Sequence, residues 1–218
     1  MMNKEEKVIK YYVLCNTLKN TIRTGWKDWK VSKDRLESVA EHIYGVQMLA
    51  IAMHSEYNYD LDIKKVIMML AIHELEEIYI GDLTLFQITK QEKEKLGHEA
   101  ILKVLDGLLN KEELLELILE FDEQETKEAI FAFQCDKLEC DLQSKIYDEE
   151  NAVDLNNQQG NKIFNDKKVQ ELLKKETTWS GMWLSFGQDR YNYDKHFTAI
   201  SNYAKNNSII NLIEVDKN

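Results

Sequence analysis

The chain has 218 residues and no proline, which favours a mainly helical fold because proline interrupts helix interiors. Its 28 Lys and Arg stand against 39 Asp and Glu, and this formal charge of −11 argues against a broad basic surface for nucleic acid. An anionic substrate would therefore need a local cation or a bound metal ion.

The cysteine and hydropathy patterns predict a cytoplasmic protein. Three cysteines are too few and too unevenly spaced for a disulfide framework or a zinc-binding CxxC pair. The first residues lack the apolar core of a signal peptide, and the longest strictly apolar run, residues 66–72, is far too short to span a membrane. We therefore expect neither a membrane nor a nucleic-acid partner.

Apolar side chains recur at intervals of three and four along most of the chain, which predicts amphipathic helices. The expected helices cover residues 8–22, 39–53, 63–80, 90–109, 112–120, 126–147 and 166–175, and a last helix ends near Lys205. Ser38 and Glu41 fit a capping box at the start of the second helix, and Gly81 suits the end of the third. The pattern predicts an all-α helical bundle.

Two stretches between these helices are predicted to be loops. Residues 23–37 are polar and turn-like, and without proline we expect Gly25 and side-chain contacts to shape them. Residues 149–161 are acidic and then rich in Asn and Gln, which is typical of a surface loop.

The chain is expected to form one domain over residues 1–218, with a core at about residues 10–149 and a C-terminal helical extension at about residues 162–210. The extension is rich in aromatic residues, among them Trp179 and Trp183. Such residues serve in a hydrophobic core or at a subunit interface, and the sequence leaves both uses open.

Polar side chains on otherwise apolar helix faces mark a candidate site. His42 lies in the apolar stripe of the second helix, His73 continues that of the third, and Glu77 follows one turn later. Asp136 lies on the apolar side of the helix over residues 126–147. A buried carboxylate is costly unless it is paired or bound to a metal ion. Nitrogen and oxygen ligands without thiolate suit Mn, Co, Fe, Zn or Mg.

Ordinary structural interpretations exist for each residue taken alone. Asp136 could pair with Lys137, and Glu76 is interpreted as solvent-facing. A single histidine on a helix face is usually a satisfied core or surface residue, and we assign that role to His54, His98 and His196. The zinc-protease motif HExxH is excluded, because Glu77 stands where its second histidine should be.

Four short motifs, in this order and spacing, resemble the HD-domain metal phosphohydrolases and within them the 5′-deoxynucleotidase branch. The motifs are Arg23-Thr-Gly-Trp26, Glu37-Ser-Val-Ala-Glu-His42, His73-Glu-Leu-Glu-Glu77 followed by Gly81-Asp82, and Cys135-Asp136-Lys-Leu-Glu-Cys. The resemblance covers about residues 10–149, and each motif alone would be weak. It implies an all-α HD fold, a divalent metal cofactor and a homodimer.

The resemblance also implies a metal-ligand set, made of His42, His73, Glu74 and Asp136. One position departs from the family pattern, because the family has Asp where this chain has Glu74. Glutamate is still an oxygen ligand but is one methylene longer. The departure therefore bears on the metal preference and the rate more than on the fold.

Further roles implied by the resemblance concern catalysis and the substrate. Glu77 and Asp82 correspond to the family's acidic pair beside the metal, which in some members holds a second ion together with a backbone carbonyl, here that of Leu83. Arg23 corresponds to the arginine that orients the substrate phosphate, and Trp26 to an aromatic residue that lies against the sugar. Asp82 is expected to contact the substrate as well.

The leading hypothesis is a metal-dependent phosphomonoesterase that hydrolyses (deoxy)nucleoside 5′-monophosphates to nucleoside and phosphate. A second hypothesis keeps this chemistry with a nucleoside triphosphate or an alarmone as substrate, which would use the cations at positions 23, 27, 30, 33 and 35. A third is a non-enzymatic helical binding module in which Glu74 marks a decayed metal site.

Overall fold

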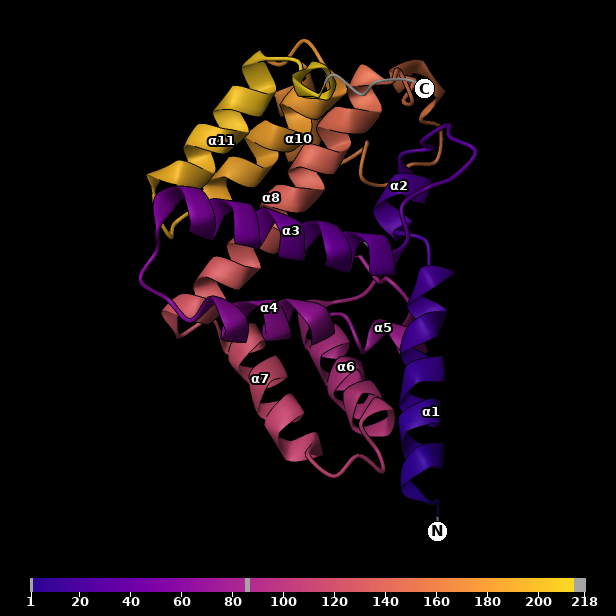
Figure 1. Ribbon diagram of the computed structural model, residues 1–218. Helices are drawn as coiled ribbons and strands as arrows, with labels where there is room; N and C mark the ends of the chain where they lie inside the picture. The colour runs from indigo at the N-terminus through magenta and orange to yellow at the C-terminus, as the bar shows by residue number, and fades with distance from the viewer. Residues whose placement is uncertain (1, 85–86, 214–218) are drawn as a thin grey trace, which may run out of the picture. The chain divides into compact units, whose positions relative to one another are not determined.

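A computed structural model describes residues 2–84 and 87–213, and this part of the chain is helical (Figure 1). The α-helices are α1 Lys4–Asn16, α2 Thr24–Asp28, α3 Val39–Tyr57, α4 Ile63–Ile72, α5 Glu77–Ile80, α6 Lys90–Val104, α7 Lys111–Glu123, α8 Lys127–Glu149, α9 Lys167–Leu173, α10 Trp179–Gly187 and α11 Lys195–Asn206. Short 3₁₀ helices are η1 Thr17–Lys19, η2 Leu155–Asn157, η3 Gln188–Arg190 and η4 Ile210–Leu212. The described residues contain no strand, and the prediction of an all-α fold is confirmed.

The chain divides into two compact units. Unit 1 comprises Met1–Gly25 and Leu36–Cys135, and unit 2 comprises Trp26–Arg35 and Asp136–Asn218. The dividing points fall inside α2 and α8, so each of these helices contributes to both units. The expectation of a single domain over residues 1–218 stays a prediction.

Unit 1 is built around α3 and α4, which pack against each other, while α4 also contacts α7 and α5 contacts α6. Its apolar core is made of Leu18, Val39, Ile72, Leu75, Ile101, Val104, Leu105 and Ile118. The start of α3 is fixed as predicted: Ser38 Oγ accepts the Glu41 N–H at 3.3 Å, and the Glu41 carboxylate accepts the Ser38 N–H at 2.9 Å. This capping box sets the register of the helix that presents His42.

The prediction of one helix over residues 63–80 is wrong at one place. α4 ends at Ile72 and α5 begins at Glu77, and the intervening residues form tight turns in which the Leu75 N–H donates to the Ile72 carbonyl at 3.2 Å. The ring Nδ1 of His73 lies 2.8 Å from the carbonyl oxygen of Leu70, the acceptor that the Glu74 N–H would use in a regular α-helix. The ring N–H of His73 thus takes the place of the backbone N–H of Glu74 as donor at the point where the helix stops. Competition between a side chain and the backbone for one acceptor disfavours continuation of the helix.

The expectation for residues 23–37 also needs correction. The segment contains α2 and two fully buried anchors, Trp26 and Trp29, so it is not a polar surface loop. Gly25 lies inside α2, whereas the left-handed turn is made by Lys30 at φ 51°. The Val31 N–H then returns to the Trp26 carbonyl at 3.0 Å.

Unit 2 has an aromatic core, and in it α10 packs against α9 and α11. Trp26 lies among Tyr147, Trp179 and Trp183, with ring centroids 5.3 to 6.3 Å away. Trp179 is 1% exposed, which confirms the core interpretation for this residue.

Residues 149–161 are only partly the surface loop that was expected. Gln158 and Asn161 are buried, and each makes a side-chain hydrogen bond inside unit 2. Gln158 donates to the Trp29 carbonyl at 3.0 Å, and Asn161 donates to Gln158 Oε1 at 2.9 Å. Gln158, which the sequence pattern places in a surface loop, therefore holds the backbone at Trp29, and Asn161 holds Gln158 in turn.

None of the helices in the described part of the chain is both long enough and apolar enough to cross a membrane.

Candidate metal centre

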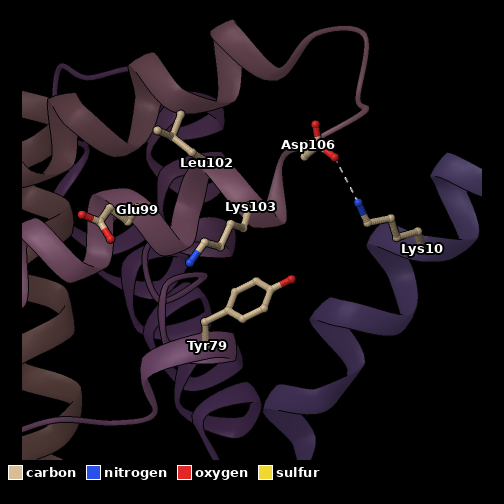
Figure 2. Close-up of a pocket in the computed structure, with 6 residues that line it drawn as sticks. All are labelled: Lys10, Tyr79, Glu99, Leu102, Lys103 and Asp106. Atoms are coloured by element: carbon tan, nitrogen blue, oxygen red, sulfur yellow. Dashed lines mark hydrogen bonds and ion pairs between the residues drawn. The ribbon is translucent and has the colours of Figure 1, made fainter. Parts of the chain in front are cut away.

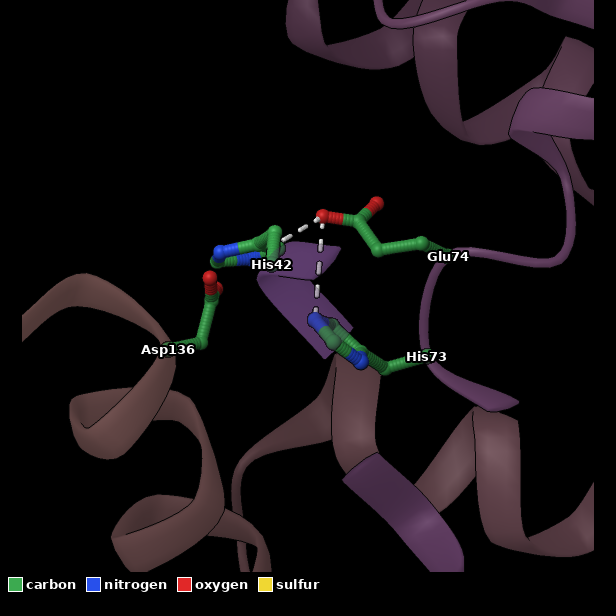
Figure 3. A group of neighbouring side chains, drawn as sticks. All are labelled: His42, His73, Glu74 and Asp136. Atoms are coloured by element: carbon green, nitrogen blue, oxygen red, sulfur yellow. Dashed lines mark ion pairs between the residues drawn. The ribbon is translucent and has the colours of Figure 1, made fainter. Parts of the chain in front are cut away.

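Four of the residues expected from the sequence come together as a possible metal site. One ligand atom each from His42, His73, Glu74 and Asp136 lies within 4.8 Å of the others (Figure 3). His42 comes from the first turns of α3, and His73 and Glu74 from the turn after α4. Asp136 lies on α8 directly after Cys135, the last residue of unit 1.

The ring of His73 is oriented by a hydrogen bond to the last turn of α4. Its Nδ1 lies 2.8 Å from the Leu70 carbonyl oxygen, and since a carbonyl only accepts, Nδ1 must bear the proton. When the ring is neutral, the other ring nitrogen, Nε2, presents its lone pair toward the cluster, 3.7 Å from Glu74 Oε1. A backbone carbonyl that fixes the tautomer in this way is the usual support of a metal-binding histidine.

Glu74 reaches the cluster despite its additional methylene. Its Oε1 lies 3.8 Å from Nε2 of His42 and 3.7 Å from Nε2 of His73, and both rings are almost fully buried (Figure 3). Because the turn interrupts the helix, the consecutive residues His73 and Glu74 point into one cluster, whereas consecutive residues of a regular helix face different directions.

The donor atoms suit a divalent cation. Two neutral imidazole nitrogens and two carboxylate oxygens give a mixed nitrogen–oxygen set without sulfur, which accommodates Mn, Co, Fe or Zn. Asp136 is 3% exposed, and at this depth a carboxylate requires a cation or a hydrogen-bond donor. Part of that requirement is met by Lys137 Nζ, 2.7 Å from Asp136 Oδ2, the pairing that the sequence had suggested. The residues present therefore fit the metal that the sequence resemblance implies.

Arg23 borders this cluster through Glu74. Its Nη1 lies 3.3 Å from Glu74 Oε1, and only 14% of the arginine side chain is exposed. The following residue, Thr24, is fixed twice by Asp82: its N–H donates to Asp82 Oδ2 and its hydroxyl donates to the Asp82 carbonyl, both at 2.6 Å. Asp82 thus anchors the turn that presents Arg23.

Glu77 lies deeper, at 2% exposed. Neither of its carboxylate oxygens has a hydrogen-bond partner among the described residues, and Lys93 Nζ is 4.0 Å from Oε1. Burial raises the pKa of Glu77 to about 11, and the negative charges of Glu74 and Asp82 act in the same direction. A carboxyl group in such a setting needs a cation or a proton.

Two residues of this region were missed by sequence reasoning. Glu76 is not solvent-facing as predicted: its Oε2 is buried, and burial together with the charge of Glu74 raises its pKa to about 8. Lys93, on α6, is the other. Burial alone would lower the pKa of its ammonium group, but nearby carboxylates, chiefly Glu74 and Glu77, outweigh that effect and leave the pKa raised. Lys93 belongs to a charged run, and nothing in its spacing distinguishes it from its neighbours.

Trp26 and Leu83, two residues that were expected at the site, are not among the four clustered side chains. Trp26 is 1% exposed and surrounded by rings of unit 2, so its indole offers a sugar almost no free surface. Leu83 is half-buried after Asp82. Among the described residues, Glu77 and Asp82 form no group of three metal-ligating side chains.

A separate open hollow lies on unit 1 and is lined by Lys10, Tyr79, Glu99, Leu102, Lys103 and Asp106 (Figure 2). Lys10 and Asp106 face each other across it at 3.3 Å. None of the predicted site residues lines it, so the chemistry discussed here belongs to the buried cluster.

The family model of the HD domain matches residues 15–176. The 5′-deoxynucleotidase HDDC2 of Dictyostelium discoideum is 31% identical over 150 residues, which cover 65% of this chain and 78% of that protein. The 5′-deoxynucleotidase hdd1 of Schizosaccharomyces pombe is 28% identical over 152 residues, covering 66% of this chain and 74% of its own.

Solved structures show the same architecture. A conserved hypothetical protein from Pyrococcus furiosus is 26% identical, with a TM-score of 0.59 over 77% of this chain and 97% of its own. A "predicted metal-dependent phosphohydrolase" from Magnetospirillum magnetotacticum MS-1 is 21% identical, with a TM-score of 0.63 over 96% of this chain and 97% of its own, and this likeness concerns the fold alone.

Proposed function

The chain belongs to the HD domain family, and from this premise we propose that it is a metal-dependent phosphomonoesterase that releases phosphate from (deoxy)nucleoside 5′-monophosphates. The single observation that supports this most strongly is the convergence of His42, His73, Glu74 and Asp136 to within 4.8 Å. The related proteins named 5′-deoxynucleotidase suggest the substrate class.

The four clustered side chains are proposed to hold one divalent ion. When bound, such an ion supplies Lewis acidity, which offsets phosphate charge and makes a water molecule more acidic. The protein's own task is to position the reactants: most of the barrier to phosphate-ester hydrolysis must be removed by electrostatics and orientation.

Arg23 is proposed to bind the substrate phosphate. A guanidinium group offers a planar fork of N–H donors that matches two phosphate oxygens. Asp82 fixes Thr24 at two points, so the neighbouring Arg23 is presented from a tethered turn rather than from a mobile loop. We assign Asp82 this positioning role beside its expected contact with the substrate.

Glu77 is proposed to serve the reaction by placing the attacking water or by donating a proton to the leaving 5′ oxygen. Its burial keeps bulk water away, and that strengthens the effect of its charge or its proton on a bound substrate. For Trp26, its burial leads us to propose a structural role in the core of unit 2 instead of contact with the sugar.

A phosphate-release assay on the manganese-loaded full chain tests this proposal. Nucleoside 5′-monophosphates should give inorganic phosphate, and Asp136→Asn should reduce the rate at least about 100-fold, because the ion contributes several kcal/mol of transition-state stabilisation. His98→Ala, an exposed histidine on α6, is the matched control and should leave the rate unchanged. Folded, metal-loaded protein that releases no phosphate from any monophosphate would refute the proposal.

The same assay separates the other two hypotheses. Pyrophosphate or triphosphate as product would favour a polyphosphate substrate, yet two of the cations that this reading requires are already engaged. Lys30 Nζ donates to the Gln159 carbonyl at 2.8 Å, and Lys33 lies 2.9 Å from Glu150. Activity that appears only in Glu74→Asp would favour a decayed site. The expected homodimer and cytoplasmic location stay predictions.

A further inference from the structure

Unit 1 gathers acidic side chains where an anionic substrate is expected to bind. Glu74, Glu76, Glu77 and Asp82 all lie within nine residues of one another in the chain, and all four act electrostatically on a single ammonium group, that of Lys93. A phosphate monoester carries negative charge of its own, and each of these acidic groups that is ionised repels it at close range. A cation close to these acidic groups would offset that repulsion and help to bind the phosphate.

Lys93 and Arg23 are both protein cations that act on Glu77. The two come from different elements: Arg23 precedes α2, and Lys93 lies in the first turn of α6. Lys93 Nζ lies 4.0 Å from Glu77 Oε1, which is ion-pair distance without a hydrogen bond. The ammonium group is thus attracted to the acidic residues without being locked to one of them.

The exposure of Lys93 suits a contact with a ligand. Its side chain is 28% exposed while that of Glu77 is 1% exposed, so the lysine reaches solvent and the carboxylate does not. A lysine ammonium is a compact charge on a flexible stem and turns readily toward a new anion. A phosphate group arriving from solvent would meet such a charge before reaching Glu77.

We propose that Lys93 is a second phosphate-binding cation of the metal centre, opposing the local carboxylates and assisting Arg23. This rests on the proposed function for the identity of the substrate, whereas the charge relationship can be measured without turnover. A cation in this position has two consequences of opposite sign. It attracts the phosphate, and it repels the divalent ion.

Two titrations of the full chain test this inference. The first adds Mn²⁺ to chelator-treated protein, and the second adds inorganic phosphate to the manganese-loaded protein, both followed by calorimetry. Lys93→Met should bind Mn²⁺ several-fold more tightly and phosphate about 10-fold more weakly, as expected for loss of one nearby charge. If the chain turns over nucleotides, the KM should rise by a similar factor, with a smaller change in kcat.

Matched variants separate charge from structural support. Lys93→Arg retains the charge and should preserve both affinities, and Lys95→Met removes an exposed lysine of the same helix and should change neither. If Lys93→Met does not fold, Lys93→Gln takes its place. If Lys93 served only as structural support, Lys93→Met would weaken the binding of both Mn²⁺ and phosphate. That result would overturn the inference. Unchanged affinities, or a Lys93→Arg variant that behaves like Lys93→Met, would overturn it as well. Loss of nucleotide turnover in the wild type with these affinity changes intact would refute the proposed function alone.

Discussion

Acidic side chains are buried or half-buried in both units, but they are satisfied in different ways. In unit 2, Asp141 accepts the Tyr191 hydroxyl at 2.5 Å, Asp148 accepts the Ser180 hydroxyl at 2.6 Å, and Glu176 lies 2.6 Å from Lys205. In unit 1, both carboxylate oxygens of Glu77 lack a hydrogen-bond partner among the described residues.

This difference indicates what each set of acids is for. A buried carboxylate with a short hydrogen bond or ion pair contributes to the packing of its own unit. A buried carboxylate that is left without one lowers stability, and such a cost is tolerated where a ligand or a reaction needs the group. Glu77 is therefore expected to support activity at a cost in stability, whereas Asp141, Asp148 and Glu176 are expected to support stability.

The largest effect is expected at Glu77. Glu77→Leu keeps a similar volume, removes an unsatisfied buried carboxyl, and should lower phosphate release about 100-fold or more if Glu77 acts as an acid or base. The free energy of unfolding of chelator-treated protein should rise by about 1–3 kcal/mol, since desolvation of the group is no longer required. Phosphate-release rates and denaturant unfolding measure the two effects.

Asp141→Leu is the counterpart in unit 2. It leaves the buried Tyr191 hydroxyl without its acceptor, so the same type of substitution should destabilise the protein. Equal destabilisation of the protein by Glu77→Leu and by Asp141→Leu would contradict the different roles assigned to these two buried acids.

A steric effect of intermediate size is expected at Gly187, in α10. A Cβ added to this glycine would collide with the carboxylate of Asp141, which is 3% exposed and cannot easily move. Because the backbone at Gly187 is helical, with φ −71°, the cost is steric alone. Gly187→Ala should lower the free energy of unfolding by up to about 3 kcal/mol, as measured by denaturant unfolding.

The catalytic rate of the Gly187→Ala molecules that remain folded should stay near that of the wild type. Gly181→Ala is a weaker comparison in the same helix, since an added Cβ there meets mainly the Thr178 hydroxyl and the Glu176 side chain. Loss of activity in folded Gly187→Ala protein would contradict the assignment of this region to packing.

The most gradual effect concerns pH. Burial raises the pKa of Asp141 from 3.8 to about 7, although the Tyr191 hydroxyl acts in the opposite direction. Between these values the folded chain binds more protons at Asp141 than the unfolded chain does, so this residue makes stability fall as pH rises from about 4 to 7. The slope from one group is at most about 1.4 kcal/mol per pH unit.

Asp141→Asn should remove that contribution. Chelator-treated wild type and Asp141→Asn would be unfolded with denaturant at several values of pH between 4 and 8, and the difference in their free energies of unfolding plotted. A difference that does not change with pH would mean that Asp141 is ionised throughout, and that its hydroxyl partner outweighs burial.

Several features of the protein follow from the sequence alone. The helical fold follows from apolar periodicity and the absence of proline, and both signals are local. The Ser38 capping box and the burial of His42, His73 and Asp136 likewise follow from spacing, since a polar residue on an apolar stripe is carried into the core with its neighbours. Order and spacing of four short motifs were sufficient to indicate the family.

Other features were decided only by the tertiary structure. The end of α4 at Ile72 depends on a ring nitrogen of His73 that reaches the Leu70 carbonyl. The apolar periodicity of the sequence continues past this point and gives no indication that the helix stops. The resemblance implies that Trp26 lies against the substrate sugar. Its burial by Tyr147 and the tryptophans of α10, which are more than a hundred residues away in the sequence, has no signal in the local pattern. Lys93 gains its significance from Glu77, which lies on another helix. Local patterns determine which side chains face inward, but the charges and contacts that they meet there come from distant segments, and these give a buried acid either a partner or a function.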